Sequence, residues 1–142
     1  MSAKNASDAL GLLKVVENAT NDVTDMLQRI RELAVQAQND TNSDGDIANL
    51  QLEAEALMDE INRVSADTTY NGVAYLAEDA GNANATSRTV NIQVGYNDGD
   101  VIAITTYAID AENLAIVDSA SDGTGSFKDL SLIHISEPTR RS

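Results

Sequence analysis

Apolar residues recur at helical spacing near the start of the chain. Between residues 6 and 38 they follow one another at alternating intervals of three and four, at Ala9, Leu12, Val16, Ala19, Val23, Met26, Ile30, Leu33 and Ala37. This heptad pattern predicts one long amphipathic helix over about residues 6–38. Small residues at many seam positions permit another helix to approach closely, whereas Gly11 is unfavourable inside a helix.

A polar segment, NDTNSDGD at residues 39–46, interrupts this pattern with residues that favour turns. The spacing of three and four then resumes at Ile47, Leu50, Ala54, Leu57, Ile61 and Val64, which predicts a second helix over about residues 46–66. Asp44 or Asp46 can cap its start. The short break predicts that the two helices form an antiparallel pair with facing seams. Because the second helix is shorter, we expect residues 9–23 of the first seam to remain exposed.

The apolar period changes from helical spacing to two in the second half of the chain. Val90, Ile92, Val94 and Tyr96 alternate with polar or small residues, and a second run follows at Val101–Tyr107. The sequence Asn97-Asp98-Gly99-Asp100 lies between the two runs, and Asp-Gly in that position predicts a β-hairpin over about residues 88–108. The expected fold class is therefore α+β: a long helix, an antiparallel second helix, and then a β-hairpin.

The chain length of 142 residues is that of a single domain, which we assign to residues 1–117. Residues 78–87 are predicted to be a polar loop, and residues 118–130 are predicted to be a flexible linker. The last twelve residues, SLIHISEPTRRS, contain the only His and the only Pro of the sequence. Because their composition differs from the rest, we interpret residues 131–142 as a non-native tail.

Charge and composition exclude several classes of function. The net charge of −14 argues against a nucleic-acid partner, which requires clustered Lys and Arg, and disfavours binding to an anionic membrane surface. No apolar run approaches the ~20 residues of a membrane span, and the N-terminus has no basic region followed by an apolar stretch. We therefore expect a protein with no cleavable secretory signal. The absence of Cys excludes disulfides, thiol nucleophiles and thiolate metal sites.

The interhelical segment contains a partial calcium-binding pattern. Oxygen-bearing or turn residues occupy positions 1, 3, 5, 6 and 8 of an EF-hand-like loop, namely Asp40, Asn42, Asp44, Gly45 and Ile47. Position 12 requires a bidentate Glu but is occupied by the neutral Gln51. A capped turn without a metal is the favoured interpretation, and a calcium-binding helical hairpin is the alternative.

Catalytic chemistry has little support in the sequence. Neighbouring carboxylates such as Glu53 and Glu55, or Asp59 and Glu60, do not converge on one point when they lie one or two positions apart on a helix. The only His lies in the terminal tail, and no pairing of a nucleophile with a base is visible. We expect that the protein is not an enzyme, and that it needs no cofactor.

Several motifs together resemble a known family. QRIRELAVQ, TNSD, EINRVS and YNG follow one another between residues 28 and 72, and VNIQVGYNDGDVIAI follows from residue 90. In order and spacing they resemble the N-terminal half of the rod domain of bacterial flagellins, over roughly residues 7–117. The resemblance implies an extracellular structural subunit of the flagellar filament, which serves motility and assembles with other flagellin subunits. A hook–filament junction protein of the same family is the alternative.

The resemblance also indicates which parts of the family are absent here. Flagellins have a preceding helical region that lines the inner tube of the filament and a C-terminal helical half that completes the rod. Neither is found in this sequence, so we expect this chain alone not to polymerise.

A recognition site follows from the same resemblance. Arg29, Leu33 and Glu53 match the patch that binds the flagellin-sensing Toll-like receptor of animal hosts. Arg29 and Leu33 are spaced i and i+4 and share a helix face, and an antiparallel pair of helices can bring Glu53 alongside. The alternative is that Arg29 and Glu53 are solvated surface charges and that Leu33 packs in the seam, as its periodicity favours.

Overall fold

The computed structural model describes residues 1–78, 86–114, 117–118 and 126–127. These residues form two helices, α1 (Ser2–Ala37) and α2 (Asp44–Asp67). They also form three antiparallel strand pairs: β1 (Thr69–Tyr70) with β2 (Val73–Ala74), β3 (Ser87–Gln93) with β4 (Val101–Tyr107), and β5 (Val117–Asp118) with β6 (Ser126–Phe127). The predicted α+β fold class is confirmed. Most of the predicted polar loop and of the predicted linker, and all of the predicted tail at 131–142, lie outside the described residues.

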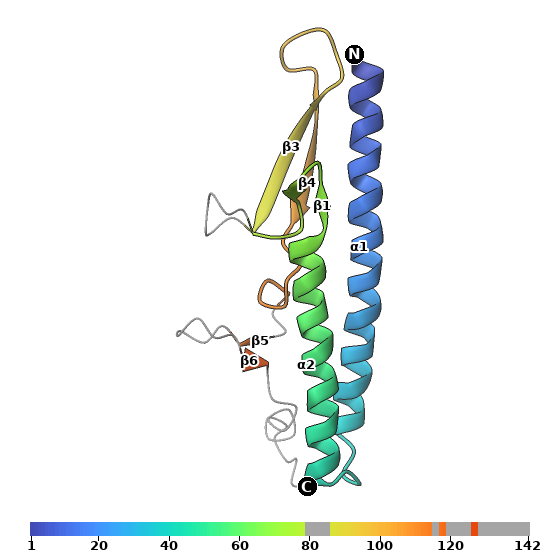
Figure 1. Cartoon of the computed structure of the whole chain (residues 1–142), viewed down its shortest axis with the longest axis vertical. Helices are drawn as coiled ribbons and strands as arrows, with labels where there is room; N and C mark the ends of the chain where they lie inside the picture. The colour runs from blue at the N-terminus through green and yellow to red at the C-terminus, as the bar shows by residue number, and fades with distance from the viewer. Residues whose placement is uncertain (79–85, 115–116, 119–125, 128–142) are drawn as a thin grey trace, which may run out of the picture.

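The described elements form an elongated rod around α1. This helix of 36 residues is about 54 Å long at the standard rise per residue, and it begins at Ser2 rather than at the expected residue 6. Figure 1 shows that α2 lies antiparallel along one half of α1, and that the hairpin of β3 and β4 lies along the other half. The second helix and the hairpin therefore follow one another along the same rod.

The turn between the helices is closed by side chains. Ser43, rather than Asp44 or Asp46, is the N-cap of α2, which corrects the sequence prediction. The Ser43 hydroxyl accepts the Asp46 N–H at 3.2 Å, and the Asp46 carboxylate accepts the Ser43 N–H at 3.0 Å. This reciprocal capping box satisfies two backbone donors that the helix start leaves free. Asp46 was therefore correctly associated with the helix start, but as the N3 residue.

The seams of the two helices form the core in the α2 half of the rod. One buried cluster contains Val23, Ile30, Met58, Ile61 and Ala111. A second cluster, near the turn, contains Leu33, Ala37 and Ala54. Two of the three residues in the second cluster are Ala, and such small side chains allow two helix backbones to pack closely. The facing seams predicted from the heptad spacing are therefore the observed contact.

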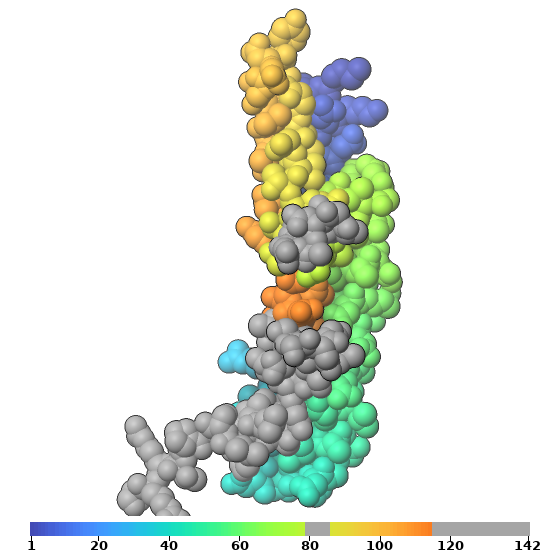
Figure 2. All heavy atoms as spheres, turned by 90° about the vertical axis from the view of Figure 1, so that its left-hand side faces the viewer, coloured from blue at the N-terminus to red at the C-terminus, as the bar shows by residue number. Residues whose placement is uncertain are grey.

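The seam between residues 9 and 23 is covered, contrary to the prediction that it would be exposed. Leu12 is only 2% exposed and Val23 only 3%. Where α2 has ended, α1 contacts β1 and β3, and Figure 2 shows the yellow β3 alongside the blue start of α1. The side chains of Val90 and Ile92 are half-buried on alternate positions of β3. The prediction was wrong for two reasons: α2 reaches Val23, which clusters with Met58 and Ile61, and β1 and β3 contact α1 where α2 has ended.

A tight turn brings Tyr70 against α1. Asn71 and Gly72 lie between β1 and β2 with φ of 51° and 78°, which are the two left-handed positions of a two-residue hairpin turn. A Cβ atom added to Gly11 would lie 2.9 Å from the Tyr70 hydroxyl oxygen. The glycine that is unfavourable for the helix therefore leaves room for the Tyr70 ring.

The predicted hairpin is present with a longer connection than its Asp-Gly motif suggested. The paired strands end at Gln93 and resume at Val101, so Val94 and Tyr96 lie in the loop and not in a strand. Asp100 closes the loop, because its carbonyl accepts the Val94 N–H at 2.9 Å and its carboxylate accepts the Asn97 N–H at 3.1 Å. The loop thus keeps its own hydrogen bonds while leaving Tyr96 fully exposed.

The carbonyl of Leu76 joins three parts of the rod. It accepts the Ser65 hydroxyl of α2 at 2.6 Å and the Ile109 N–H, which follows β4, at 3.0 Å. Nearby, the Asn62 side-chain oxygen accepts the Ala111 N–H at 2.8 Å. Because Ser65 and Leu76 are both buried, these polar groups need partners inside the protein. The hydrogen bonds fix the chain that follows β2 and the chain that follows β4 onto α2.

Candidate functional site

The exposed side of the helix pair carries an ion pair between α1 and α2. The Arg29 Nε donates to Glu53 Oε1 at 2.8 Å, and a second guanidinium nitrogen lies 2.7 Å from the same oxygen. Of the ion pairs Lys14–Glu17, Arg29–Glu32, Arg29–Glu53, Arg63–Glu60 and Arg63–Asp67, the Arg29–Glu53 pair joins two elements, whereas the others lie within one helix. The structure therefore brings together Arg29 and Glu53, as the antiparallel arrangement predicted.

A third residue extends this pair along α1. Glu32 accepts a hydrogen bond from the Arg29 Nη1 at 3.2 Å, at the i,i+3 spacing. Hydrogen bonds to Glu53 and to Glu32 raise the pKa of Arg29 above its ordinary value. The side chains of Arg29 and Glu53 remain 46% and 44% exposed, so solvent screens the attraction and the pair contributes little to folding. Its principal property is an ordered pattern of charge at the surface.

Leu33 is not part of this exposed surface, although the resemblance places it in one patch with Arg29 and Glu53. Its side chain is fully buried, at 0% exposure, in the cluster with Ala37 and Ala54. The i,i+4 spacing places Leu33 one turn from Arg29, but the heptad seam rotates its side chain under α2. The seam-packing alternative therefore holds for Leu33 in this chain.

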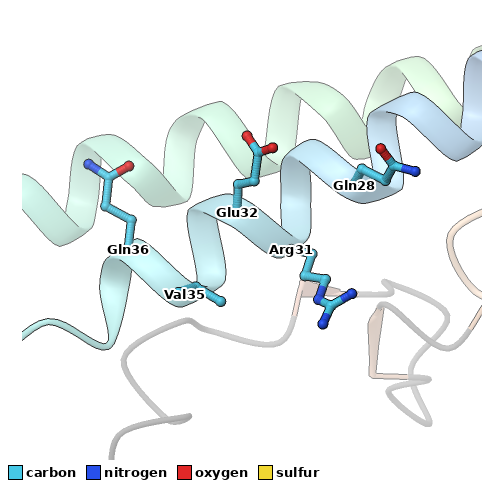
Figure 3. Close-up of a pocket in the computed structure, with 5 residues that line it drawn as sticks. All are labelled: Gln28, Arg31, Glu32, Val35 and Gln36. Atoms are coloured by element: carbon cyan, nitrogen blue, oxygen red, sulfur yellow. The ribbon is translucent and has the colours of Figure 1, made fainter.

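An open hollow of about 530 Å³ adjoins the charged cluster. It is lined by described residues of α1, namely Gln28, Arg31, Glu32, Val35 and Gln36. Figure 3 shows Arg31 and Val35 extending from one side of the helix, and Glu32 and Gln36 extending from another. The described lining residues therefore all belong to α1 and extend from more than one side of that helix.

The interhelical segment does not have the backbone of an EF-hand-like loop. The helix α2 already begins at Asp44, the fifth position of the proposed loop, so Gly45 and Ile47 are helical. The Asn42 amide donates to the carbonyls of Gln36 and Asn39, at 2.6 and 2.9 Å. Within the described ranges, no group of three or more His, Cys, Asp or Glu side chains is placed to hold a metal ion. The segment is a capped turn, and the calcium interpretation is not supported.

The acidic side chains of α2 make contacts along the helix surface. Glu60 accepts the Arg63 Nε at 2.8 Å, and Glu55 accepts the Gln51 amide at 3.1 Å. The hydrogen bond from Arg63 lowers the pKa of Glu60. These are the short-range helical pairs expected from their spacing, and they do not assemble a substrate site. In the part of the chain that the structure describes, no helix is long and apolar enough to cross a membrane.

Two features of the rod, one at the charged cluster and one beyond the end of α2, were not predicted from the sequence. Glu32 shares Arg29 with Glu53, and its i,i+3 spacing from Arg29 was the available signal. The turn at Asn71-Gly72 was noted only as part of a family motif, although Asn-Gly between two apolar residues is itself a hairpin signal. Both the i,i+3 spacing and the Asn-Gly pair are local sequence patterns. Their structural roles depend on contacts with other segments, Glu53 on α2 in the first case and Gly11 on α1 in the second.

The amino-acid sequence is similar to those of known flagellins. A model of the family "Bacterial flagellin N-terminal helical region" matches residues 1–80. The phase 1 flagellin of Salmonella naestved and the flagellin of Salmonella dublin are each 40% identical over 115 residues, which is 81% of this chain. The chain spans about a fifth, 21%, of the length of these curated relatives.

Solved structures show the same architecture. The Bacillus cereus flagellin structure matches 95% of this chain and 72% of its own, with a TM-score of 0.66 and 26% identity. The FliC structure from Burkholderia pseudomallei matches 71% of this chain and 37% of its own, with a TM-score of 0.62 and 34% identity. With the family match covering more than half of its residues, the chain belongs to the bacterial flagellin family.

Proposed function

We propose that this chain is a segment of a structural subunit of the bacterial flagellar filament, and that it contributes half of a rod domain to that subunit. The observation that carries the proposal is the match of residues 1–80 to the flagellin N-terminal helical region, in a chain folded as a rod of antiparallel helices. The relatives and solved structures described above are named flagellins, which favours a filament subunit over a hook–filament junction protein. Its partners are then other flagellin subunits.

The same proposal places the protein outside the cell, on the flagellum, and assigns it no catalytic role. Long helices packed lengthwise supply a stiff unit with an extended lateral surface, which is what a polymer subunit requires. The negative net charge of −14 supports solubility before assembly. We further propose that export occurs without a cleavable signal peptide.

A chimaera tests the filament proposal. This chain's residues 1–114 would replace the matching segment of Salmonella flagellin in a strain that lacks its own flagellin. We expect filaments by electron microscopy and recovered swimming. The matched control carries the native Salmonella segment reinserted through the same joints. Normal amounts of chimaera in the medium without any filament, while the control forms filaments, would contradict the proposal.

A second function concerns recognition by an animal host. We propose that Arg29 and Glu53 contribute to a surface read by the flagellin-sensing Toll-like receptor, with Leu33 supporting that surface from below. The ordered charges at 2.7 Å and the adjoining hollow support this role, because interfaces favour rigid Arg side chains on helices. A receptor carboxylate must share or displace the existing contacts of Arg29 with Glu53 and Glu32.

Surface plasmon resonance with the immobilised receptor tests this surface. We expect Arg29→Ala to weaken binding severalfold or more, because it removes the guanidinium and the alignment of both carboxylates. Asp67→Ala, at the far end of α2, is the control and should change binding little. Circular dichroism should show helices in both variants, since Ala favours helix. Equal binding by well-folded wild-type and Arg29→Ala proteins would rule out this patch.

A further inference from the structure

We propose that Asn71 is a site of spontaneous deamidation, in which the backbone nitrogen of Gly72 attacks the Asn71 side-chain amide. The sequence contains one Asn-Gly pair, and it is this one. Both residues are exposed, and an added Cβ at Gly72 would meet no atom within 4 Å. The attacking nitrogen therefore belongs to an exposed residue that has no side chain to obstruct the reaction.

The reaction needs only water as co-reactant. The Gly72 nitrogen loses its proton and bonds to the Asn71 Cγ, while the bond from Cγ to the side-chain nitrogen breaks and ammonia leaves. The product is a five-membered succinimide ring. Water then adds to one of its two carbonyls, and the ring opens to aspartate or to isoaspartate. The amide is replaced by a carboxylate, so the chain gains one negative charge.

The local structure favours reaction at Asn71 over reaction at the described amides that are held by hydrogen bonds. The strands flanking the turn pair only at Thr69 with Ala74 and at Tyr70 with Val73, so little pairing must break for the backbone to reach the attack geometry. Among the described residues, no hydrogen bond holds the Asn71 side chain. By contrast, the Asn42 amide donates to two carbonyls and the Asn5 amide donates to the carbonyl of Gln93.

The product has a structural consequence beyond its charge. Isoaspartate routes the main chain through the side-chain carbon and lengthens the turn by one methylene. The two left-handed positions at Asn71 and Gly72 then no longer match the pairing of β1 with β2. Because Tyr70 immediately precedes the turn and packs at Gly11, the change loosens part of the cover on the first half of α1. Deamidation would thus act as an age-dependent alteration of the rod.

Incubation of the whole chain at mildly alkaline pH, followed by peptide mass mapping and isoaspartyl methyltransferase labelling, tests the proposal. We expect Asn71 to deamidate at least severalfold faster than Asn91, which lies in β3 and precedes Ile92. The control Asn71→Gly removes the reactive amide, and Gly tolerates the left-handed φ. The Asn71→Gly variant should lack the labelled product and should keep its hydrogen-exchange protection near Leu12. The isoaspartyl fraction of the wild-type chain should lose the protection near Leu12. Deamidation at Asn71 no faster than at Asn91 would overturn the proposal, and unchanged protection in the isoaspartyl fraction would overturn its structural consequence.

Discussion

Gly11 of α1 packs against the side chain of Tyr70 from β1, which leaves no room for a larger residue at position 11 without a shift. In a helix interior Gly is unfavourable relative to Ala by about 1 kcal/mol, so Gly11→Ala alone would stabilise an isolated helix. Here the new Cβ would lie 2.9 Å from the Tyr70 hydroxyl oxygen and 3.3 Å from the nearest ring carbon. The packing of the Tyr70 ring therefore opposes the helix propensity.

The first prediction is a coupling between these two residues. In the wild-type background, Gly11→Ala should stabilise the protein by clearly less than about 1 kcal/mol, or should destabilise it. In a Tyr70→Phe background, which lacks the hydroxyl that the new Cβ would approach, Gly11→Ala should increase the free energy of unfolding by more than it does in wild type. Urea unfolding of the four proteins gives the coupling free energy. An effect of Gly11→Ala that is identical in both backgrounds would contradict the contact.

The second prediction concerns acid. Hydrogen bonds from the Ser43 backbone N–H and hydroxyl lower the pKa of Asp46 below its ordinary value of 3.8. A folded-state pKa below the unfolded one means that the stabilisation is fully present above the unfolded value and disappears as pH falls through the folded value. Urea unfolding should show wild type more stable than Asp46→Asn at neutral pH, with a gap that narrows below pH 3.8. A gap that is constant with pH would show that the carboxylate charge does not matter for the cap.

The helix pair is stabilised by its buried seam far more than by its surface charges. Leu33 is completely buried between α1 and α2, whereas the charged groups of Arg29 and Glu53 are each nearly half exposed. Burial of apolar side chains is the larger contribution, since exposed ion pairs are screened by water and salt. The buried seam therefore determines how the two helices pack, whereas the ion pair mainly determines the charge pattern on their exposed surface.

The third prediction compares two leucines of the helix pair. Leu33→Ala should destabilise the protein by about 2–5 kcal/mol, because it removes buried methyl groups and leaves a cavity. Leu52→Ala, at a site that is 64% exposed, should change stability by no more than about 0.5 kcal/mol. Chemical denaturation followed by circular dichroism measures both. Similar losses from the two substitutions would mean that the seam is not the main contact between the helices.

The whole rod has two different covers on one helix. The α2 helix covers the second half of α1, and the strands β1 and β3 cover the first half. Each of these two segments buries its own part of the α1 seam, so the two halves of α1 can lose protection from hydrogen exchange separately. This division is a property of the whole molecule, and it follows from the lengths of the two helices.

The fourth prediction tests this division with two substitutions that add the same charge. Ile92→Asp places a carboxylate on the half-buried side of β3, whereas Asn91→Asp places one on its exposed side. Hydrogen exchange should show lost protection around Leu12 in Ile92→Asp, with protection around Leu33 retained. Asn91→Asp should resemble wild type. Loss of protection along all of α1 in Ile92→Asp would show that the rod opens as one unit.

The amino-acid sequence by itself determined the two helices, the β3–β4 hairpin and the family of this protein. Spacing of three and four is a local property of a helix, so the two seams and their facing arrangement could be read from positions such as Ile30 and Ile61. Alternation of apolar and polar residues likewise predicted β3 and β4, but not the two-residue strands β1, β2, β5 and β6. Motif order predicted the family. Arg29 and Glu53 could be placed on neighbouring helices because a short turn permits one main arrangement.

Only the tertiary structure decided which segments cover which surfaces. For Leu33, the periodicity favoured a buried seam position, whereas the resemblance assigned it to a receptor-binding patch. A resemblance matches positions in two sequences and does not show whether a side chain is buried, so the structure was needed to decide. No local pattern predicted that β1 and β3 would contact α1, that Leu12 would be buried, or that Tyr70 would pack at Gly11. These contacts join residues far apart in sequence, and their free energy depends on the complementary shapes of two surfaces. Shape complementarity exists only after the chain has folded, so it could not be read from the order of the residues.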